Sequence, residues 1–173
     1  MERHPLYQVD AFTDRPFAGN PAAVMPLEAW LPDEVMQAIA AENNLSETAF
    51  FVPEADGFRI RWFMPVGEID LCGHATLASA FVILTELRAG AGRVDFRSMS
   101  GPLTVTREGD LFCLDFPARR PNPVPCPPGF AEALGAEVKE AWLTRDLFAL
   151  LESEAAVRDL KPDMDALSRL EPT

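Results

Sequence analysis

The segment 73–87 constrains the fold more than any other part of this chain. Between positions 75 and 84 only Thr76 and Ser79 are polar, and both are small. The length of the segment and its Ala and Leu content predict a helix rather than a strand. A helix without a polar face must be covered on all sides. We therefore expect a curved sheet wrapped around it.

Short strands are predicted on both sides of this helix. Runs of alternating or continuous apolar residues, bounded by Gly, Pro and Asn, lie at 6–12, 22–25, 48–52, 58–62, 94–97, 103–106 and 111–116. One amphipathic helix is expected between Asp33 and Asn43, with Val35, Met36, Ile39 and Ala40 on its apolar stripe. The predicted fold class is α+β, with an antiparallel-rich β-barrel wrapped around a central helix.

A proline-rich segment divides the chain. Six prolines fall between positions 117 and 128, a density that no helix and no central strand tolerates. We expect an N-terminal barrel domain over 1–117, an extended linker over 118–128 and the incomplete beginning of a second domain over 129–173. Residues 129–173 are too few to form a stable hydrophobic core on their own.

Charge and cysteine content exclude several classes of function. Fifteen Lys and Arg against 27 Asp and Glu give a net charge of −12, which disfavours nucleic acid and anionic membrane surfaces. No apolar run approaches the roughly 18–20 residues of a membrane span, and no signal core follows the N-terminus. The three cysteines and two histidines match no zinc spacing. We expect a cytoplasmic protein without a metal.

Glu47 is the first candidate for chemistry. It lies in the segment Asn44-Leu45-Ser46-Glu47-Thr48, between the end of a predicted helix and an apolar strand. Partial desolvation there would raise the pKa of its carboxyl group and suit it to general acid/base catalysis. The alternative is a solvated loop acid, or a charge that protects the edge of a strand.

The start of the apolar helix supplies the other candidates. At Gly73 and His74, unpaired backbone N–H groups and the helix dipole could hold a carboxylate, and the imidazole could carry a proton. Cys72 directly precedes this helix start, where its thiol could become nucleophilic or basic. The alternatives are a histidine that only caps the helix or satisfies the core, and a cysteine that is a small buried apolar residue.

These residues belong to a set of motifs that resembles the PhzF-like family of phenazine-biosynthesis isomerases, within the diaminopimelate epimerase-like superfamily. The matching segments, in order, are 9–13, 17–24, 42–50, 61–63, 70–78, 100–103 and 151–163. The resemblance implies two barrel domains, each around a central helix, with an active site between them. It also implies cofactor-free proton transfer by Glu47 in a small cyclic amino-acid-type carboxylate, so that a double bond migrates. Gly73 and His74 would bind the substrate carboxylate.

The chain departs from this family in length. Family members run roughly half as long again, and their second domain supplies groups that face the glutamate, so the chain looks truncated relative to them. One copy would then carry half a site, and we expect a homodimer. Two alternatives stay open: a cysteine-based racemase or epimerase that uses Cys72, and a non-catalytic remnant that dimerises.

Overall fold

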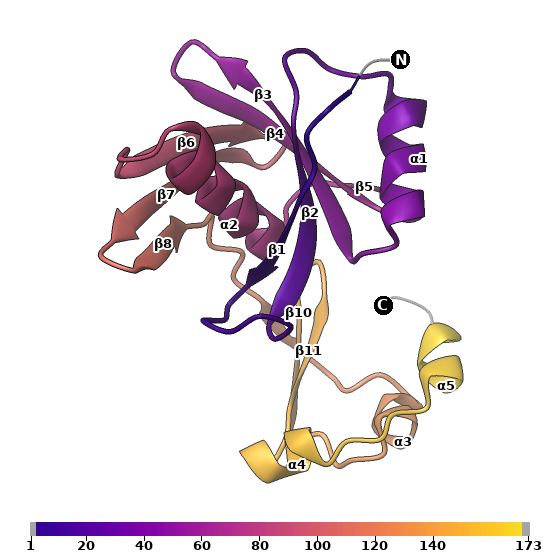
Figure 1. Ribbon diagram of the computed structural model, residues 1–173. Coiled ribbons are helices and arrows are strands. Elements are labelled where there is room, and N and C mark those ends of the chain that lie inside the picture. The colour runs from indigo at the N-terminus through magenta and orange to yellow at the C-terminus, as the bar shows by residue number, and fades with distance from the viewer. Residues whose placement is uncertain (1–2, 171–173) are drawn as a thin grey trace. The chain divides into compact units, whose positions relative to one another are not determined.

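The computed structural model describes residues 3–170, which fall into two units divided after Pro117. The first unit holds a curled half-barrel and two helices, and the second holds a small sheet and three short helices (Figure 1).

The first unit is built on one mixed sheet in the order β1-β2-β3-β4-β6-β7-β8, with β5 on β4. β2 pairs with β3 and β4 with β6 in parallel, and the other pairs are antiparallel. The strands are β1 (Tyr7–Ala11), β2 (Asn20–Pro26), β3 (Glu47–Glu54), β4 (Gly57–Met64), β5 (Gly67–Ile69), β6 (Arg93–Ser98), β7 (Gly101–Glu108) and β8 (Leu111–Asp115). This confirms the predicted α+β class with a sheet curled around a helix.

Strand β3 is buried on both faces because a helix covers each of them. Ala49 and Phe51 belong to the core that surrounds α2 (Gly73–Val82), inside the curl. Phe50 and Val52 belong to a second core cluster, which includes Met36 and Ala40 of α1 (Asp33–Asn43). Helix α1 lies on the opposite side of the sheet from α2 (Figure 1). Successive side chains of a strand point to opposite faces, so a continuous apolar run is what a strand between two helices requires.

The buried hydroxyl groups of helix α2 donate hydrogen bonds to backbone carbonyls one turn earlier in the chain. The hydroxyl of Thr76 donates to the carbonyl of Cys72 at 2.5 Å, and that of Ser79 donates to the carbonyl of Ala75 at 2.7 Å. Both side chains are fully buried. These local bonds satisfy the hydroxyls and let the helix lie in an apolar core. A π-helical turn, Ile83–Leu87, continues the helix and completes the predicted segment.

The cover over α2 is incomplete on one side, unlike the all-round wrapping expected. The sheet does not close, because β1 and β8 are its two edges. A groove of about 960 Å³ lies between them and includes Leu77 and Phe81 of α2. Phe81 is 40% exposed and contacts the ring of Phe112 edge-on, with ring centroids 5.7 Å apart. The structure is therefore a half-barrel rather than a closed barrel.

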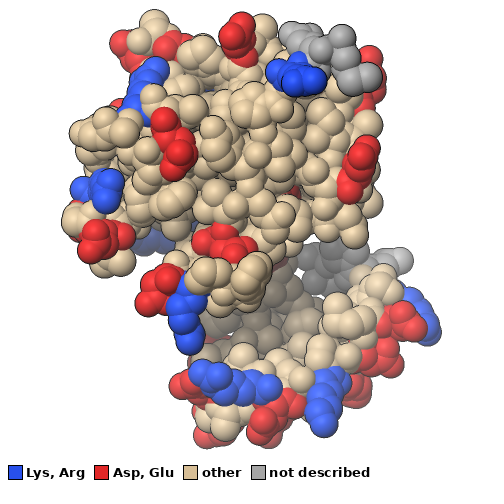
Figure 2. All heavy atoms as spheres, in the orientation of Figure 1, with Lys and Arg blue, Asp and Glu red and all other residues tan. Residues whose placement is uncertain are grey.

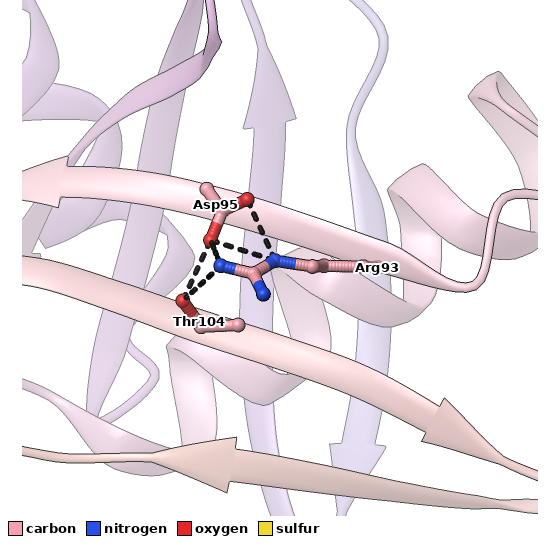
Figure 3. A network of polar contacts seen from close by, with 3 residues as sticks. All are labelled: Arg93, Asp95 and Thr104. Atoms are coloured by element: carbon pink, nitrogen blue, oxygen red, sulfur yellow. Dashed lines mark hydrogen bonds and ion pairs between the residues drawn. The ribbon is translucent and has the colours of Figure 1, made fainter.

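A polar network links β6 to β7 on the outer surface (Figure 3). The guanidinium of Arg93 donates to Asp95 Oδ1 at 2.7 Å, and the hydroxyl of Thr104 donates to the same oxygen at 2.6 Å. The Arg93 hydrogen bonds, with help from Thr104, lower the pKa of the Asp95 carboxyl below its usual value. The group is exposed, so its effect on stability is small.

The second unit contains a three-stranded antiparallel sheet in the order β11-β10-β9. Its elements are β9 (Asn122–Val124), α3 (Phe130–Leu134), β10 (Glu140–Leu143), β11 (Leu147–Leu150), α4 (Glu154–Arg158) and α5 (Met164–Ser168). The segment expected as a linker thus includes strand β9, in which Pro123 lies opposite Trp142. Proline is tolerated there because β9 is an edge strand.

The surface carries charges of both signs. On the face shown in Figure 2, Lys and Arg side chains lie among Asp and Glu rather than in one continuous basic area. In the described part of the chain, every helix is too short or too polar to cross a membrane.

Candidate active site

The sheet register directs Glu47 toward the helix α2. Val9 of β1 lies opposite Ala22 of β2, and Ala22 lies opposite Glu47 of β3. Residues in one such row share a face of the sheet. Val9 and Ala22 both pack in the core around α2. The carboxylate of Glu47, at the first position of β3, is therefore placed on the inner face of the curl.

The N-terminus of α2 carries the other three predicted residues. Cys72 is the residue before the first turn, in an extended conformation, and Gly73 and His74 are the first two residues of the helix. The side chain of Cys72 makes no capping hydrogen bond to the backbone of this helix start. The first backbone N–H groups of a helix have no partner within it, and together with the dipole they favour an anion.

Glu47, His74 and Cys72 meet in one cluster. Oε2 of Glu47 lies 3.2 Å from Nε2 of His74, and Sγ of Cys72 lies 3.5 Å from Nδ1 of the same ring. The imidazole is thus flanked by a carboxylate on one nitrogen and a thiol on the other. The structure therefore places Glu47 next to the start of α2. The functional role of each of these residues stays a prediction.

The contact between Glu47 and His74 in this cluster is close but poorly aligned. Glu47 and His74 are largely buried, with 14% and 9% of their side chains exposed. Among residues 3–170, neither Glu47 Oε2 nor His74 Nε2 finds a partner with the geometry of a hydrogen bond. A buried polar atom in that state carries a free-energy cost of about 1–3 kcal/mol. A bound molecule that supplies a hydrogen bond here would remove that cost.

Burial controls the ionisation of His74. It lowers the pKa of the imidazole below 6.5, its ordinary value, while the charge of Glu47 and the Pro21 backbone act in the opposite direction. The net effect lowers the pKa, because removing an imidazolium from water costs more free energy than its contact with the Glu47 carboxylate returns. The ring is therefore neutral at pH 7 and can accept one proton and donate another.

The cluster contains three kinds of atom that bind metals. The carboxylate, thiol and imidazole atoms of Glu47, Cys72 and His74 all lie within 4.8 Å of one another. However, the thiol approaches Nδ1 while the carboxylate approaches Nε2, and one ion binds an imidazole through a single nitrogen. The present arrangement suits proton transfer along the ring better than coordination of one ion.

Two surrounding features were not indicated by the sequence pattern. The backbone of Pro21 raises the pKa of the His74 imidazole against the effect of burial. Pro21 can do so because it lies beside Ala22 in β2. The hydroxyl of Ser100 donates to the carbonyl of Asp70 at 2.9 Å and to its Oδ2 at 3.2 Å. This contact anchors the loop before Cys72 to the β6–β7 turn. Only knowledge of the strand pairing could have revealed either contact.

Comparisons with known proteins identify the family of this chain. The family model described as "Phenazine biosynthesis-like protein" matches residues 9–172. Two proteins of Pseudomonas aeruginosa, each named an uncharacterized isomerase, are 51% and 52% identical over 95% of this chain. The chain spans 64% of the length of either relative.

Solved structures show the same fold. A PhzF family protein of Enterococcus faecalis matches with a TM-score of 0.88 and 50% identity, over 97% of this chain and 65% of its own. A predicted epimerase of Pseudomonas aeruginosa matches with a TM-score of 0.72 and 26% identity, over 98% of this chain and 67% of its own. With its family match, its relatives and its curled sheet around an apolar helix, this chain belongs to the PhzC–PhzF family of phenazine biosynthesis-like proteins.

Proposed function

We propose that this protein is a cofactor-independent isomerase that moves a proton within a small cyclic amino-acid-type carboxylate. The observation that supports the proposal most directly is the 3.2 Å approach of the Glu47 carboxylate to His74 at the tip of α2. It places the proposed proton-transfer group, Glu47, next to the proposed anion-binding helix start. Relatives named as isomerases lend further support.

The proposed mechanism uses the groups in this cluster. The substrate carboxylate binds the first N–H groups of α2 near Gly73, and the neutral imidazole of His74 donates a hydrogen bond to it. The Glu47 carboxylate removes a proton from one carbon of the ring and returns it to another, so that a double bond migrates. Close positioning of these groups supplies much of the rate enhancement.

The relatives extend well beyond the matched region, because the chain covers 64% of the first two. We propose that groups from the second half of the fold, or from a second copy in a homodimer, complete the site and exclude water from it. Light scattering coupled to size-exclusion chromatography measures the mass in solution. A mass of twice 19.0 kDa is expected, and a strictly monomeric protein that turns over substrate would contradict the dimer.

A racemase or epimerase that uses Cys72 is the second candidate. The observation in its favour is the 3.5 Å distance between the thiol of Cys72 and Nδ1 of His74, which lets the imidazole accept the thiol proton. Such an enzyme inverts a stereocentre and leaves the double bonds in place. Chiral chromatography of the product therefore separates it from the isomerase.

The test compares Glu47→Gln with the parent protein in deuterium oxide. Cyclic amino-acid-type carboxylates are offered as substrates, and the isomerised product is followed by proton NMR. Deuterium uptake into carbon, which occurs where the Glu47 carboxyl proton exchanges with solvent before its return, is followed by mass spectrometry. Loss of general acid/base catalysis should lower the rate by about 10²–10⁴-fold. The matched control is Glu54→Gln at the other end of β3, which should keep the parent rate. Equal rates for Glu47→Gln and the parent would overturn the proposal.

A further inference from the structure

Glu47 lies at the least supported position of β3, although the proposed proton transfer depends on where its carboxylate is held. It is the first residue of the strand and pairs with Ala22 of β2. Within the described residues, the pairing of β3 with β4 begins only at Thr48, which lies opposite Phe63. A strand end with a partner on one side opens more easily than a position with partners on both sides. The place of the Glu47 carboxylate therefore depends on what holds Thr48.

Thr48 is tied to helix α1 by a hydrogen bond between side chains. The amide Nδ2 of Asn43, the last residue of α1, donates to Oγ1 of Thr48 at 3.1 Å. Thr48 is only 1% exposed, and its neighbour Phe63 belongs to the core cluster under α1. Successive side chains of a strand point to opposite faces. Thr48 therefore faces α1, whereas Glu47 faces α2.

The connection from α1 to β3 is short, which gives this hydrogen bond its effect. Only residues 44–46 lie between the helix and the strand. Asn44 ends the helix in a left-handed conformation (φ 50°), and its N–H donates to the carbonyl of Ala40 at 3.2 Å. A helix end of this kind is common. The bond from Asn43 to Thr48 then spans the connection and fixes the start of β3 against the end of α1.

We propose that Asn43 and Thr48 are positioning residues that hold the Glu47 carboxylate beside His74 from the opposite face of the sheet. The inference rests on the proposed function, in which Glu47 transfers the proton. Without the bond, the start of β3 is held less firmly and the carboxylate spends less time at its 3.2 Å distance from the imidazole. A displacement of about 1 Å in a reacting group can slow an enzyme by up to about 10²-fold.

The electrostatic effect of Glu47 on His74 gives a measurement that does not need turnover. The negative charge of Glu47 raises the pKa of the imidazole against the effect of burial. This attraction weakens as the two groups move apart. Glu47→Gln removes the charge, so the fall that it causes in the titration midpoint of His74 reports how closely the carboxylate is held. The thiol of Cys72, 3.5 Å from Nδ1, is present in every protein compared.

Two variants remove the bond from either side. Thr48→Val removes the acceptor and keeps the branched shape of the buried side chain, and Asn43→Ala removes the donor with a residue that favours a helix. The matched control is Thr104→Val on β7, which β4 and β6 separate from β3. It makes the same change and also removes a side-chain hydrogen bond, the one from Thr104 to Asp95.

The first measurement is NMR titration of proteins with ¹³C-labelled histidine. The protein has two histidines, His4 and His74, and His4→Gln assigns the signals. Glu47→Gln should lower the midpoint of His74 in the parent protein and in Thr104→Val. In Thr48→Val and in Asn43→Ala the fall should be smaller by about half or more. An equal fall in all backgrounds, or no fall in the parent, would overturn the proposal.

The second measurement is the kinetics of the proposed isomerisation. Thr48→Val and Asn43→Ala should each lower kcat by roughly tenfold and leave KM within about twofold, because the helix start that binds the carboxylate is unchanged. The double variant should lose no more than either single variant, since all three lack the same bond. Thr104→Val should keep the parent kcat. An unchanged kcat in both single variants would overturn the positioning role.

The two measurements separate this inference from the proposed function. A parent protein that isomerises no substrate would count against the proposed function, and the titration would still decide whether Asn43 and Thr48 hold Glu47 in place. If one single variant does not fold by circular dichroism, the other removes the same hydrogen bond and decides the question.

Discussion

At the scale of single residues, two glycines with similar backbones differ in what surrounds them. Gly19 (φ 81°) and Gly109 (φ 65°) both have left-handed conformations. A methyl group on Gly19 would overlap the carbonyl oxygen of Ala11, whereas one on Gly109 would meet no atom within 4 Å. Gly109→Ala should therefore lower the free energy of unfolding only by the strain of the left-handed backbone, about 1–2 kcal/mol.

We expect Gly19→Ala to cost roughly 1–3 kcal/mol more than Gly109→Ala, because β1 or the loop before β2 must move. Urea unfolding at pH 7 measures both free energies of unfolding. Equal losses in the two variants would show that the approach of Gly19 to Ala11 has no energetic effect.

His74 predicts how stability depends on pH. Burial lowers the pKa of its imidazole in the folded state, so the unfolded chain takes up a proton first as the pH falls. The stability from the neutral ring is complete above the unfolded pKa of about 6.5 and is lost as the pH falls from there toward the folded pKa. The free energy of unfolding should thus decrease between pH 7 and 5, and decrease less in His74→Gln.

Chemical denaturation at several pH values gives this difference directly. Carboxylates such as Asp95, whose pKa is also lowered, lose their stabilising effect only at more acidic pH. They are present in both proteins, so they cancel in the comparison. A steeper pH dependence in His74→Gln than in the parent would contradict the lowered pKa.

At the scale of elements, Arg61 joins the start of α1 to strands β4 and β5. Its guanidinium forms two hydrogen bonds of 2.7 Å with Glu68 and one of 2.8 Å with Asp33. It also lies over the rings of Trp30 and Phe63. A planar, forked donor is needed for this set of contacts, and an ammonium group cannot reproduce it.

Arg61→Lys should therefore lower the free energy of unfolding by about 1–3 kcal/mol, although it keeps the charge. The matched control is Arg59→Lys on the same strand, at a position exposed to solvent, which should change little. Thermal unfolding of both variants checks this. Similar melting temperatures for Arg61→Lys and the parent would show that charge alone suffices at this position.

At the scale of the whole molecule, the two units differ in the size of their cores. Large buried side chains such as Trp62, Phe50 and Phe51 lie in the first unit. In the described part of the second unit, the buried apolar residues are Ala133, Ala141 and Leu151. Little buried apolar area gives little stability against local opening.

Native-state hydrogen exchange should therefore find slower exchange in β3 and β4 of the first unit than in β10 and β11 of the second, with opening free energies several kcal/mol apart. The measurement is mass spectrometry of peptides after timed exposure to deuterium oxide. If β10 were as strongly protected as β3, the second unit would have a stability that its buried residues do not explain.

The local features of this fold could be predicted because they depend on hydrophobicity along the chain. A segment with no polar face must be buried wherever it lies, so 73–87 identified the central helix and the sheet around it. The motifs around Glu47 and His74 identified the family, which the comparisons confirm.

Tertiary structure alone decided where the half-barrel stays open and that Pro123 lies in an edge strand. It also brought Glu47, 27 residues away in sequence, to 3.2 Å from His74. The alternation of residues along one strand sets which of its faces is buried. Which strands pair, and where the sheet stays open, depends on contacts between segments that are distant in the sequence.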